Sequence, residues 1–356
     1  MTVTLRDIAK KSGLSVPTVS LVLSGRGPEL KISSGSIKLV QGIAQELGYR
    51  RNYQGMTLKS GLSMTLGVVQ IADAGSLLTC QYWSLMAAGI DHAARLAGYH
   101  ILLLGATPSP HPLEDASRVM DQHRVDAMIV MGEMLRIPSV FAHHDVPSVF
   151  LDNRHSAGRS NIAFDALPGL EAAVAHLHEL GHRRLLWIAP AADGKEASPE
   201  RRLQVARSAA QRGMELTVWH LESANARTPD DRLMGCYHED LLRMLPLPAH
   251  TTAVMCGSDL IALTLQALLQ DQGVRIPEQC SVIGFDDIQA NLAFPALTTV
   301  SHALFELGSQ AVAVALQRIG QRGKHTCIHS AVASRLVIRH STGPAPDAVL
   351  QTPSPT

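Results

Sequence analysis

The 356-residue chain lacks any apolar run long enough to cross a membrane, and it lacks the short motifs of several common enzyme classes. No stretch approaches the roughly 18 apolar residues that a membrane span requires. The opening MTVTLRDIAKK is too charged for an export signal. The patterns GxSxG, GxxxxGK[ST] and HExxH are absent. These absences argue against a membrane protein, an exported binding protein and an enzyme, and they favour a cytoplasmic location.

Cysteine is scarce, and the five cysteines show neither metal-ligand spacing nor a paired CxxC, so we expect reduced thiols. His143 and His144 precede Asp145, but the side chains of adjacent residues point in different directions. We therefore expect no metal site and no cofactor. The acidic pair Asp230–Asp231 comes without a nucleophile and is more typical of helix caps or ligand contacts than of acid/base catalysis.

Acidic and basic residues are equal in number, 31 of each, but they are unevenly distributed along the chain. Residues 1–61 contain nine Lys or Arg against three Asp or Glu, a net charge of +6, and the remainder carries −6. All seventeen histidines lie beyond residue 90. A basic segment of this kind suits the phosphate backbone of a nucleic acid.

Residues 4–23 of this basic segment contain two short helical patterns around a Gly-Leu-Ser turn. In the first pattern, Leu5, Ile8 and Ala9 recur at three- and four-residue spacing, and Gly13 can end the helix. Ser15 is placed to cap the second helix. The pattern predicts a helix-turn-helix.

In a helix-turn-helix the second helix lies in the major groove of DNA, so its exposed residues become candidates for base contacts. An ordinary helical hairpin is the alternative. The DNA-binding residues expected in this region are Thr4, Leu5, Ser15, Val16, Pro17, Thr18, Ser20, Leu21 and Arg26.

The runs TLRDIAKKSGLSVPTVSLVLSG, IAQELGYRRN and LKSG resemble the headpiece of the LacI family of bacterial transcription regulators, and the likeness extends over nearly the whole chain. The resemblance implies a third helix at about 35–47 and a hinge at 52–60 that folds on the operator. Asn52 would contact DNA there, and Leu58 would enter the minor groove. A plain linker is the alternative for this segment.

The amino-terminal part departs from the family pattern at Leu21, at Arg51 and in the loop 25–31, which is slightly long, and Val205 and Ser258 depart from it further along the chain. Leu21 stands where most members carry an arginine that reads a base, so no bidentate guanine contact is available, and we expect a different operator half-site. Arg51 stands where a proline usually precedes Asn52 and adds a candidate phosphate contact.

Beyond residue 61, short apolar runs that end in small or acidic residues alternate with amphipathic helical stretches, which predicts doubly wound parallel sheets. About 280 residues are too many for one six-stranded sheet, so we expect two lobes. The predicted fold is a small all-α helix-turn-helix domain followed by a two-lobed α/β domain. The resemblance implies a periplasmic-binding-protein-like body in which the chain crosses between lobes near residues 162, 291 and 326.

The expected domains follow from these changes in pattern. They are a headpiece at 1–51, a hinge segment at 52–62, an effector-binding domain at 63–341 and a disordered tail at 342–356. Lobe one would comprise about 63–162 and 292–325, and lobe two about 163–291 and 326–341.

Ligands of open α/β sheets bind at the carboxyl ends of the strands, and polar residues follow the apolar runs there. The resemblance adds a pair of aromatic residues and a ligand-gripping arginine. The effector-binding residues expected are Asp73, Tyr82, Trp83, Asp152, Asp165, Arg202, Ser258, Asp259 and Asp286. Simpler alternatives exist, since Asp259 and Asp287 could cap helices, Trp83 could be core, and Arg202 could be a solvated neighbour of Arg201.

The expected function is a sequence-specific transcription regulator, most simply a repressor, that binds double-stranded operator DNA as a homodimer. A small molecule would control its affinity for DNA, with a sugar or sugar acid favoured over a purine. The alternative is a solute-binding protein, exported or cytosolic, without a DNA function. The sequence does not decide whether the small molecule acts as an inducer or as a corepressor. It also leaves both a dimer and a tetramer possible, and the Pro- and Ser-rich tail, which lacks leucine heptads, favours the dimer.

We predict that DNA binding by the full chain depends strongly on salt and only weakly on pH. The logarithm of the association constant should fall linearly with the logarithm of salt concentration, by about 0.9 per phosphate contact. Changing the pH from 6 to 8 should have little effect, because the basic segment contains no histidine. Fluorescence anisotropy with a labelled duplex measures both, and binding that is indifferent to salt would contradict the prediction.

Overall fold

The computed structural model describes residues 3–50, 61–71, 80–104, 112–132, 139–142, 144–152, 159–192, 195–196, 199–222, 237–321 and 327–346. The chain forms two compact units, Met1–Leu62 and Ser63–Thr356. Each unit has its own apolar core. Among the described residues, no helix combines the length and the apolar character that crossing a membrane requires.

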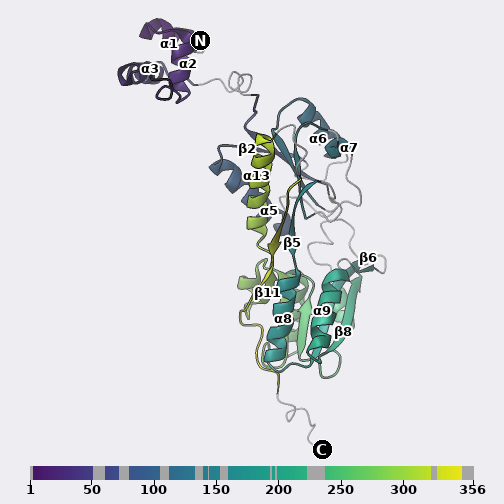
Figure 1. Ribbon diagram of the computed structural model, residues 1–356. Coiled ribbons are helices and arrows are strands. Elements are labelled where there is room, and N and C mark those ends of the chain that lie inside the picture. The colour runs from purple at the N-terminus through teal and green to yellow at the C-terminus, as the bar shows by residue number, and fades with distance from the viewer. Residues whose placement is uncertain are drawn as a thin grey trace, which may run out of the picture. The chain divides into compact units, whose positions relative to one another are not determined.

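The amino-terminal unit contains three helices, α1 (Leu5–Ser12), α2 (Val16–Leu23) and α3 (Ser34–Glu46), drawn in purple in Figure 1. One apolar cluster joins them, with Ile8 from α1, Val19 from α2 and Val40 from α3 all at 0% exposure. The three helices therefore depend on one another, since none is long enough to be stable alone.

Local sequence signals set the ends of the first two helices. The Thr4 amide and hydroxyl both donate to the Asp7 carboxylate, at 2.8 and 2.7 Å. Gly13 ends α1 with a left-handed φ of 70°, which glycine adopts at low cost. Ser15 caps α2 by accepting from the Thr18 amide at 3.3 Å. The predicted helix-turn-helix is present.

The second unit contains two sheets. The first, sheet A, is entirely parallel and has the strand order β12-β5-β4-β3-β1-β2. Its strands are β1 (Thr65–Gln70), β2 (His100–Leu104), β3 (Ala127–Met131), β4 (Ser148–Leu151), β5 (Ser160–Asp165) and β12 (His329–Ala333). We call this sheet and its helices lobe one.

The second sheet, sheet B, has the order β13-β11-β10-β9-β6-β7, and β8 also pairs with β6. Strands β13 and β7 are antiparallel to their neighbours, and the other pairings are parallel. The strands are β6 (Arg184–Ala192), β7 (Lys195–Glu196), β8 (Glu215–Glu222), β9 (Ala253–Cys256), β10 (Ser281–Asp286), β11 (Thr298–Ser301) and β13 (Arg335–Val337). This sheet and its helices form lobe two.

Helices cover both faces of each sheet, so each lobe is a three-layer α/β/α sandwich (Figure 1). In lobe one, α5 (Gln81–Leu96) and α13 (Leu304–Gly320) enclose one core, and α6 (Pro112–Asp121) and α7 (Ser139–Ala142) enclose another. In lobe two, α8 (Leu167–Glu179) and α9 (Pro199–Gln211) lie on one face. The other face carries α11 (Tyr237–Met244) and α12 (Asp259–Asp271), and a short 3-10 turn η1 (Ala290–Leu292) follows β10.

The chain passes between the sheets three times, and each passage lies further along the chain than the expected positions near 162, 291 and 326. It leaves sheet A after Asp165, returns to lobe one after Ser301, and leaves again after Ala333. The differences arise because β5 extends to Asp165 and because the short strands β11 and β12 were not recognised in the sequence. Each of these strands stays paired within its sheet up to its last residue, so the chain changes lobe only after that residue.

Helices α5 and α13 cross at very close range in lobe one. A Cβ atom built on Gly308 would lie 2.0 Å from the Met86 carbonyl oxygen, and one built on Gly89 would lie 1.9 Å from that of Phe305. No side chain fits at these distances. The two glycines therefore set the separation between the helices.

We predict that Gly308→Ala destabilises the protein while Gly320→Ala does not. The first substitution forces the helices apart and should cost about 1–3 kcal/mol. Gly320 ends the same helix, and no heavy atom lies within 4 Å of the position that an alanine methyl group would take, so alanine there should be neutral or stabilising by up to about 1 kcal/mol. Denaturant unfolding of both variants measures the difference, and equal midpoints would contradict this account of the helix crossing.

Candidate functional site

The amino-terminal unit presents the outward side of α2 to solvent. Ser15, Val16 and Pro17 are exposed, and Thr18, Ser20 and Leu21 are half-exposed. The opposite side of the helix, with Val19 and Val22, is buried in the core of this unit. A helix held this way can enter the major groove with its first turn forward.

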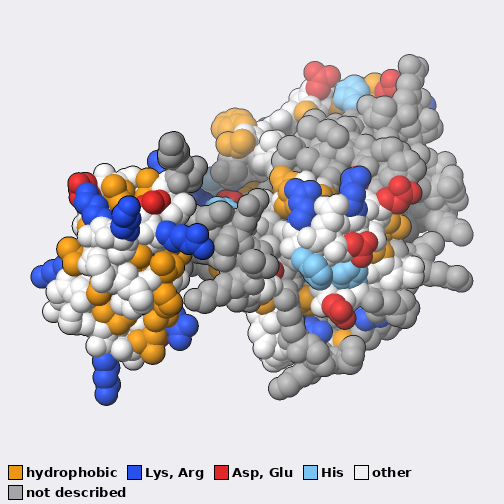
Figure 2. Space-filling model, turned by 90° about the horizontal axis from the view of Figure 1, so that it is seen from above, with side chains coloured by type: hydrophobic (Ala, Val, Ile, Leu, Met, Phe, Trp, Pro, Cys, Tyr) orange, Lys and Arg blue, Asp and Glu red, His pale blue; other side chains and the backbone are white. Residues whose placement is uncertain are grey.

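The other residues that we expect to contact DNA differ in their exposure to solvent. Thr4 and Arg26 are exposed, and Arg26 pairs with Glu29 at 3.3 Å. Leu5 packs partly into the core, so only part of it reaches the surface. Lys and Arg side chains project from several sides of this unit (Figure 2). Asn52 and Leu58 lie outside the described residues.

In the second unit, residues from both lobes meet around the imidazole of His302, which directly follows β11 and is 0% exposed. Its ring lies 4.3 Å from the Phe164 ring of lobe one and 4.7 Å from the Phe285 ring of lobe two, centroid to centroid. The Tyr82 ring lies at 6.0 Å. All three ring pairs are edge-on, the arrangement that aromatic quadrupoles favour. We call these four residues and Arg201, described below, the cleft cluster.

Two carboxylates reach the cleft cluster, one from each lobe. His302 Nε2 is 2.7 Å from Asp286 Oδ1, at the end of β10, and the Tyr82 hydroxyl donates to Asp152 Oδ2 at 3.2 Å. Burial, with Asp152 and Asp286 nearby, raises the pKa of the Tyr82 phenol well above its usual value. The hydroxyl therefore stays protonated and remains a donor to Asp152.

Of the two neighbouring arginines on α9, Arg201 reaches this site. Its guanidinium carbon lies 4.1 Å from the centre of the Phe285 ring and 5.3 Å from that of Phe164. Its Nη1 is 3.5 Å from the Gly257 carbonyl oxygen. The arginine expected from the sequence was the next residue, Arg202, whereas the contacts that the structure describes with the cleft rings are made by Arg201.

Left-handed backbone conformations gather at the same place. Asp152, Asp286, Asp287 and Ala303 have φ values of 53°, 119°, 62° and 50°, which are uncommon for residues other than glycine. Such strain persists only where the surrounding structure enforces it, and it concentrates at functional sites. The two cleft carboxylates are thus held in unusual positions.

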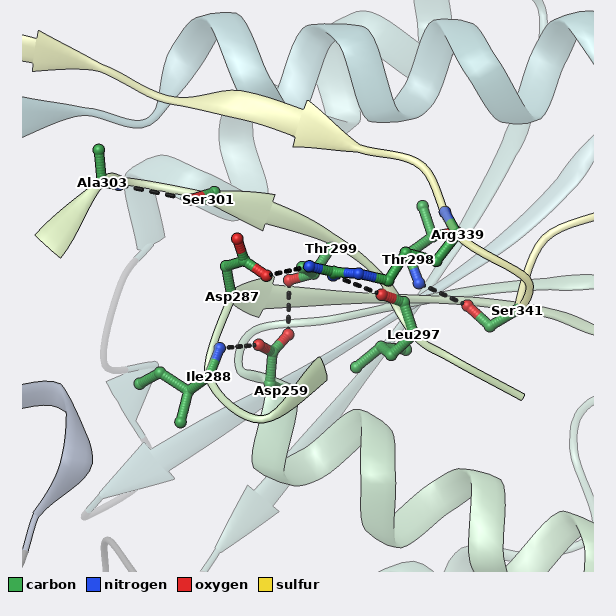
Figure 3. Close-up of polar contacts among 10 residues, drawn as sticks. All are labelled: Asp259, Asp287, Ile288, Leu297, Thr298, Thr299, Ser301, Ala303, Arg339 and Ser341. Carbon is green, nitrogen blue, oxygen red and sulfur yellow. Dashed lines mark hydrogen bonds and ion pairs between the residues drawn. The ribbon is translucent and has the colours of Figure 1, made fainter. Parts of the chain in front are cut away.

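Asp259 is enclosed by polar contacts within lobe two (Figure 3). Its carboxylate accepts from the Thr299 hydroxyl at 2.5 Å and from the Ile288 amide at 2.6 Å, and the side chain is 1% exposed. Both oxygens are occupied within the protein. Asp259 therefore ties α12 to β11 and to the loop after β10, and it was expected instead to contact the ligand.

Arg339 completes this support. It donates to the Asp287 carboxylate at 2.7 Å and to the Leu297 carbonyl at 2.9 Å (Figure 3). Asp287 is thereby committed to an ion pair within lobe two. The loop after β10 is bound on both sides, and Asp286 between these contacts is the carboxylate that faces His302.

Other expected effector residues have structural contacts. Ser258 caps α12 by accepting from the Ile261 amide at 3.3 Å, and Asp165 accepts from the Leu167 amide at 3.0 Å. Trp83 is 7% exposed and belongs to the core of lobe one, with its ring edge-on to Tyr82 at 5.0 Å. Asp73 lies outside the described residues. Of the nine expected residues, Tyr82, Asp152 and Asp286 are those that the structure brings to the cleft cluster.

Comparisons with known proteins agree with this two-part architecture. Residues 4–52 match the family model of the bacterial regulatory proteins of the lacI family, and residues 174–342 match that of the periplasmic binding protein-like domain. The chain therefore combines a lacI-family amino-terminal domain with a periplasmic binding protein-like domain, as LacI-family regulators do. The transcriptional repressor CytR of Escherichia coli is 28% identical over 96% of this chain and 97% of its own length. The repressor PurR of Haemophilus influenzae is 26% identical over 95% of this chain and 98% of its own length.

Solved structures support the LacI-family fold. The lac repressor dimer bound to operator and the anti-inducer ONPF aligns with a TM-score of 0.74 at 22% identity, and the alignment covers 96% of this chain and 100% of the repressor chain. The complex of the regulator CelR with cellobiose aligns with a TM-score of 0.60 at 23% identity, and the alignment covers 95% of this chain and 99% of the CelR chain. These relatives are transcription regulators and not enzymes, in line with the expectation from the missing catalytic motifs.

Sequence reasoning missed three members of the cleft cluster besides Arg201. His302 directly follows β11, whose sequence TTVS is mostly polar, and the rule that selected Asp286 would have selected His302 had β11 been recognised. Phe164 and Phe285 are the penultimate residues of their strands, and nothing in their pattern separates a cleft-facing phenylalanine from a core one. Their role depends on the meeting of the two sheets.

We predict that Asp259 makes stability fall as the pH rises from about 4 to about 7. Burial and the neighbouring Asp286 raise its pKa from 3.8 to about 7. Because the native carboxyl holds its proton more tightly than the unfolded one, its contribution is complete at low pH and is lost as the pH rises through about 7. The loss should be on the order of 4 kcal/mol.

Asp259→Asn should therefore flatten the dependence of the unfolding free energy on pH in this window, with Asp271→Asn as the control. Asp271 is exposed at the end of the same helix, so its loss should leave the pH profile unchanged. Denaturant unfolding at several pH values provides the measurement. Parallel profiles for wild type and Asp259→Asn would show that the carboxyl is ionised throughout.

Proposed function

We propose that the protein is a sequence-specific transcription repressor whose affinity for operator DNA is set by a small molecule bound between its two lobes. The observation that carries the proposal is the combination in one chain of an outward-facing α2 with a cleft cluster drawn from both lobes. The first feature supplies a DNA-reading surface. The second supplies a site whose occupation can change how the lobes meet.

Each recognition helix would lie in one major groove of a pseudo-palindromic operator, with the residues around Leu21 at the base edges. Leucine offers a contact to a thymine methyl group and no bidentate contact to guanine. Asn52 and Leu58 would act in the hinge, at the central minor groove. The fold and the family of the headpiece support these roles.

A homodimer follows from the two-fold symmetry of such an operator, and the lac repressor that resembles this chain is a dimer on its operator. We place one contact between subunits at the turn after β10. Leu292 and Phe294 are 76% and 92% exposed there, and the Gln270 amide fixes the turn by donating to the Phe294 carbonyl at 2.9 Å. Large apolar side chains so exposed are typical of interfaces.

The effector we propose is a sugar or a sugar acid. Tyr82, Phe164 and Phe285 provide ring faces and edges, and Asp152, Asp286 and Arg201 provide acceptors and donors for polar groups of the ligand. The resemblance to the CelR complex with cellobiose is consistent with this class. Purines are the second candidate, from the likeness to PurR.

Coupling would pass through the passages between the lobes. His302 stands on the second passage and contacts residues of both lobes, so a ligand at the cleft cluster can change the angle between them. A change in lobe one would reach the headpieces of a dimer through the hinge segments. As a regulator of chromosomal genes, the protein would act in the cytoplasm.

We predict that selection from random duplexes enriches a pseudo-palindrome and that Leu21→Arg changes the preferred base at one position of each half-site. The new arginine can contact guanine bidentately, which is worth about 1–3 kcal/mol of discrimination. Leu39→Arg adds the same charge on α3, where Leu39 is 49% exposed, and should raise affinity without altering base preference. Absence of any enriched sequence with the wild-type protein would refute a specific DNA-binding function.

A further inference from the structure

Arg201 carries a positive charge that no residue in the described part of the chain neutralises. Its Nε is buried without a hydrogen-bond partner, and its one hydrogen bond, from Nη1 to the Gly257 carbonyl, is 3.5 Å long. No Asp or Glu of the described residues forms an ion pair with it. The Phe285 and Phe164 rings attract the guanidinium but supply no acceptor. The guanidinium is half-exposed while its Nε is buried, so a ligand could provide both the missing acceptor and the counter-charge.

His302 has a vacant nitrogen at the same place. Its Nε2 is engaged by Asp286 at 2.7 Å, while Nδ1 is buried and has no partner among the described residues. The imidazole and the Arg201 guanidinium contact the same two rings, Phe164 and Phe285. Two unsatisfied nitrogen groups therefore lie around one pair of aromatic rings, one of them on a side chain that is 0% exposed.

We propose that Arg201 and His302 form a binding site for a hydroxylated oxyanion, so that the effector is a small molecule carrying a carboxylate or a phosphate together with hydroxyl groups. This inference rests on the proposed function and narrows its ligand class. In the bound form, the anion accepts from Arg201 Nε, and a hydroxyl group of the same ligand donates to His302 Nδ1. The His302 Nε2 proton stays on the hydrogen bond to Asp286.

A neutral sugar fits these groups less completely. Its hydroxyls could donate to Nδ1 and accept from Nε, but they would leave the guanidinium charge uncompensated. A purine base could stack on the rings with the same deficit. A hydroxylated anion is the ligand chemistry that satisfies both nitrogens and the charge together.

The test is a thermal-shift panel on the full-length protein, with matched acidic and neutral sugars at about 10 mM. Carboxylates are gluconate, glucuronate and galacturonate; phosphates are glucose 6-phosphate and fructose 1-phosphate; neutral members are glucose, galactose, fructose and cellobiose. We expect an acidic member to raise the melting temperature by several degrees while its neutral counterpart does not. The carboxylate and phosphate arms distinguish the two sources of the oxyanion. A shift from a neutral member alone, or no shift from any acid, overturns the proposal.

The role of His302 is tested on the acid that binds. His302→Gln removes the ring nitrogen Nδ1 and keeps a polar side chain that can donate to Asp286, so it should weaken binding of this acid about tenfold. Unchanged affinity in His302→Gln would contradict the role of His302.

A second arm needs no ligand. Arg201→Met replaces an uncompensated charge with an apolar side chain of similar length, so the melting temperature of the free protein should stay unchanged or rise. Arg207→Met, at an exposed position on the same helix, is the matched control. A fall of several degrees for Arg201→Met relative to Arg207→Met would show that Arg201 is structural and would overturn the site. Specific DNA binding by the wild type is measured separately, without any sugar. If it is found while the ligand tests fail, the oxyanion site is wrong and the proposed DNA-binding function stands.

Discussion

The loop that follows β10 depends on three polar contacts, and the geometry of the cleft depends on that loop. Asp286 contacts His302, Asp287 pairs with Arg339, and the Ile288 amide donates to Asp259. The loop backbone is left-handed at two successive aspartates, a conformation that would relax without such contacts. Buried polar groups of this kind strongly favour one arrangement, because each lost partner leaves an unsatisfied charge or amide.

Two of these contacts connect the loop to passages between the lobes. His302 follows β11, on the passage that returns the chain to lobe one, and Arg339 follows β13, beyond the last passage. A ligand that contacts His302 therefore acts on a residue of the passage itself. The route from the ligand to the angle between the lobes is then short, because one side chain contacts both lobes.

The sequence alone predicted the alternation of strands and helices, the helix-turn-helix with its Gly13 and Ser15 signals, and the two-lobed body. Its failures have a common cause. Strands β8, β11 and β12 are short or only partly apolar, so no periodic signal marked them. The choice between Arg201 and Arg202 required the rotation of α9, and the supporting role of Asp259 required knowledge of which strands are adjacent. Local patterns predict elements, whereas the site arises from contacts between elements distant in sequence.

The central claim is that a small molecule in the cleft changes the affinity for operator DNA. The most direct measurement titrates the full-length protein onto its selected operator at fixed salt, with and without a saturating ligand known to stabilise the two-lobed body. The account predicts a change in operator affinity of at least about fivefold, with nonspecific DNA affected much less. A ligand that saturates the cleft and leaves operator affinity unchanged would contradict it.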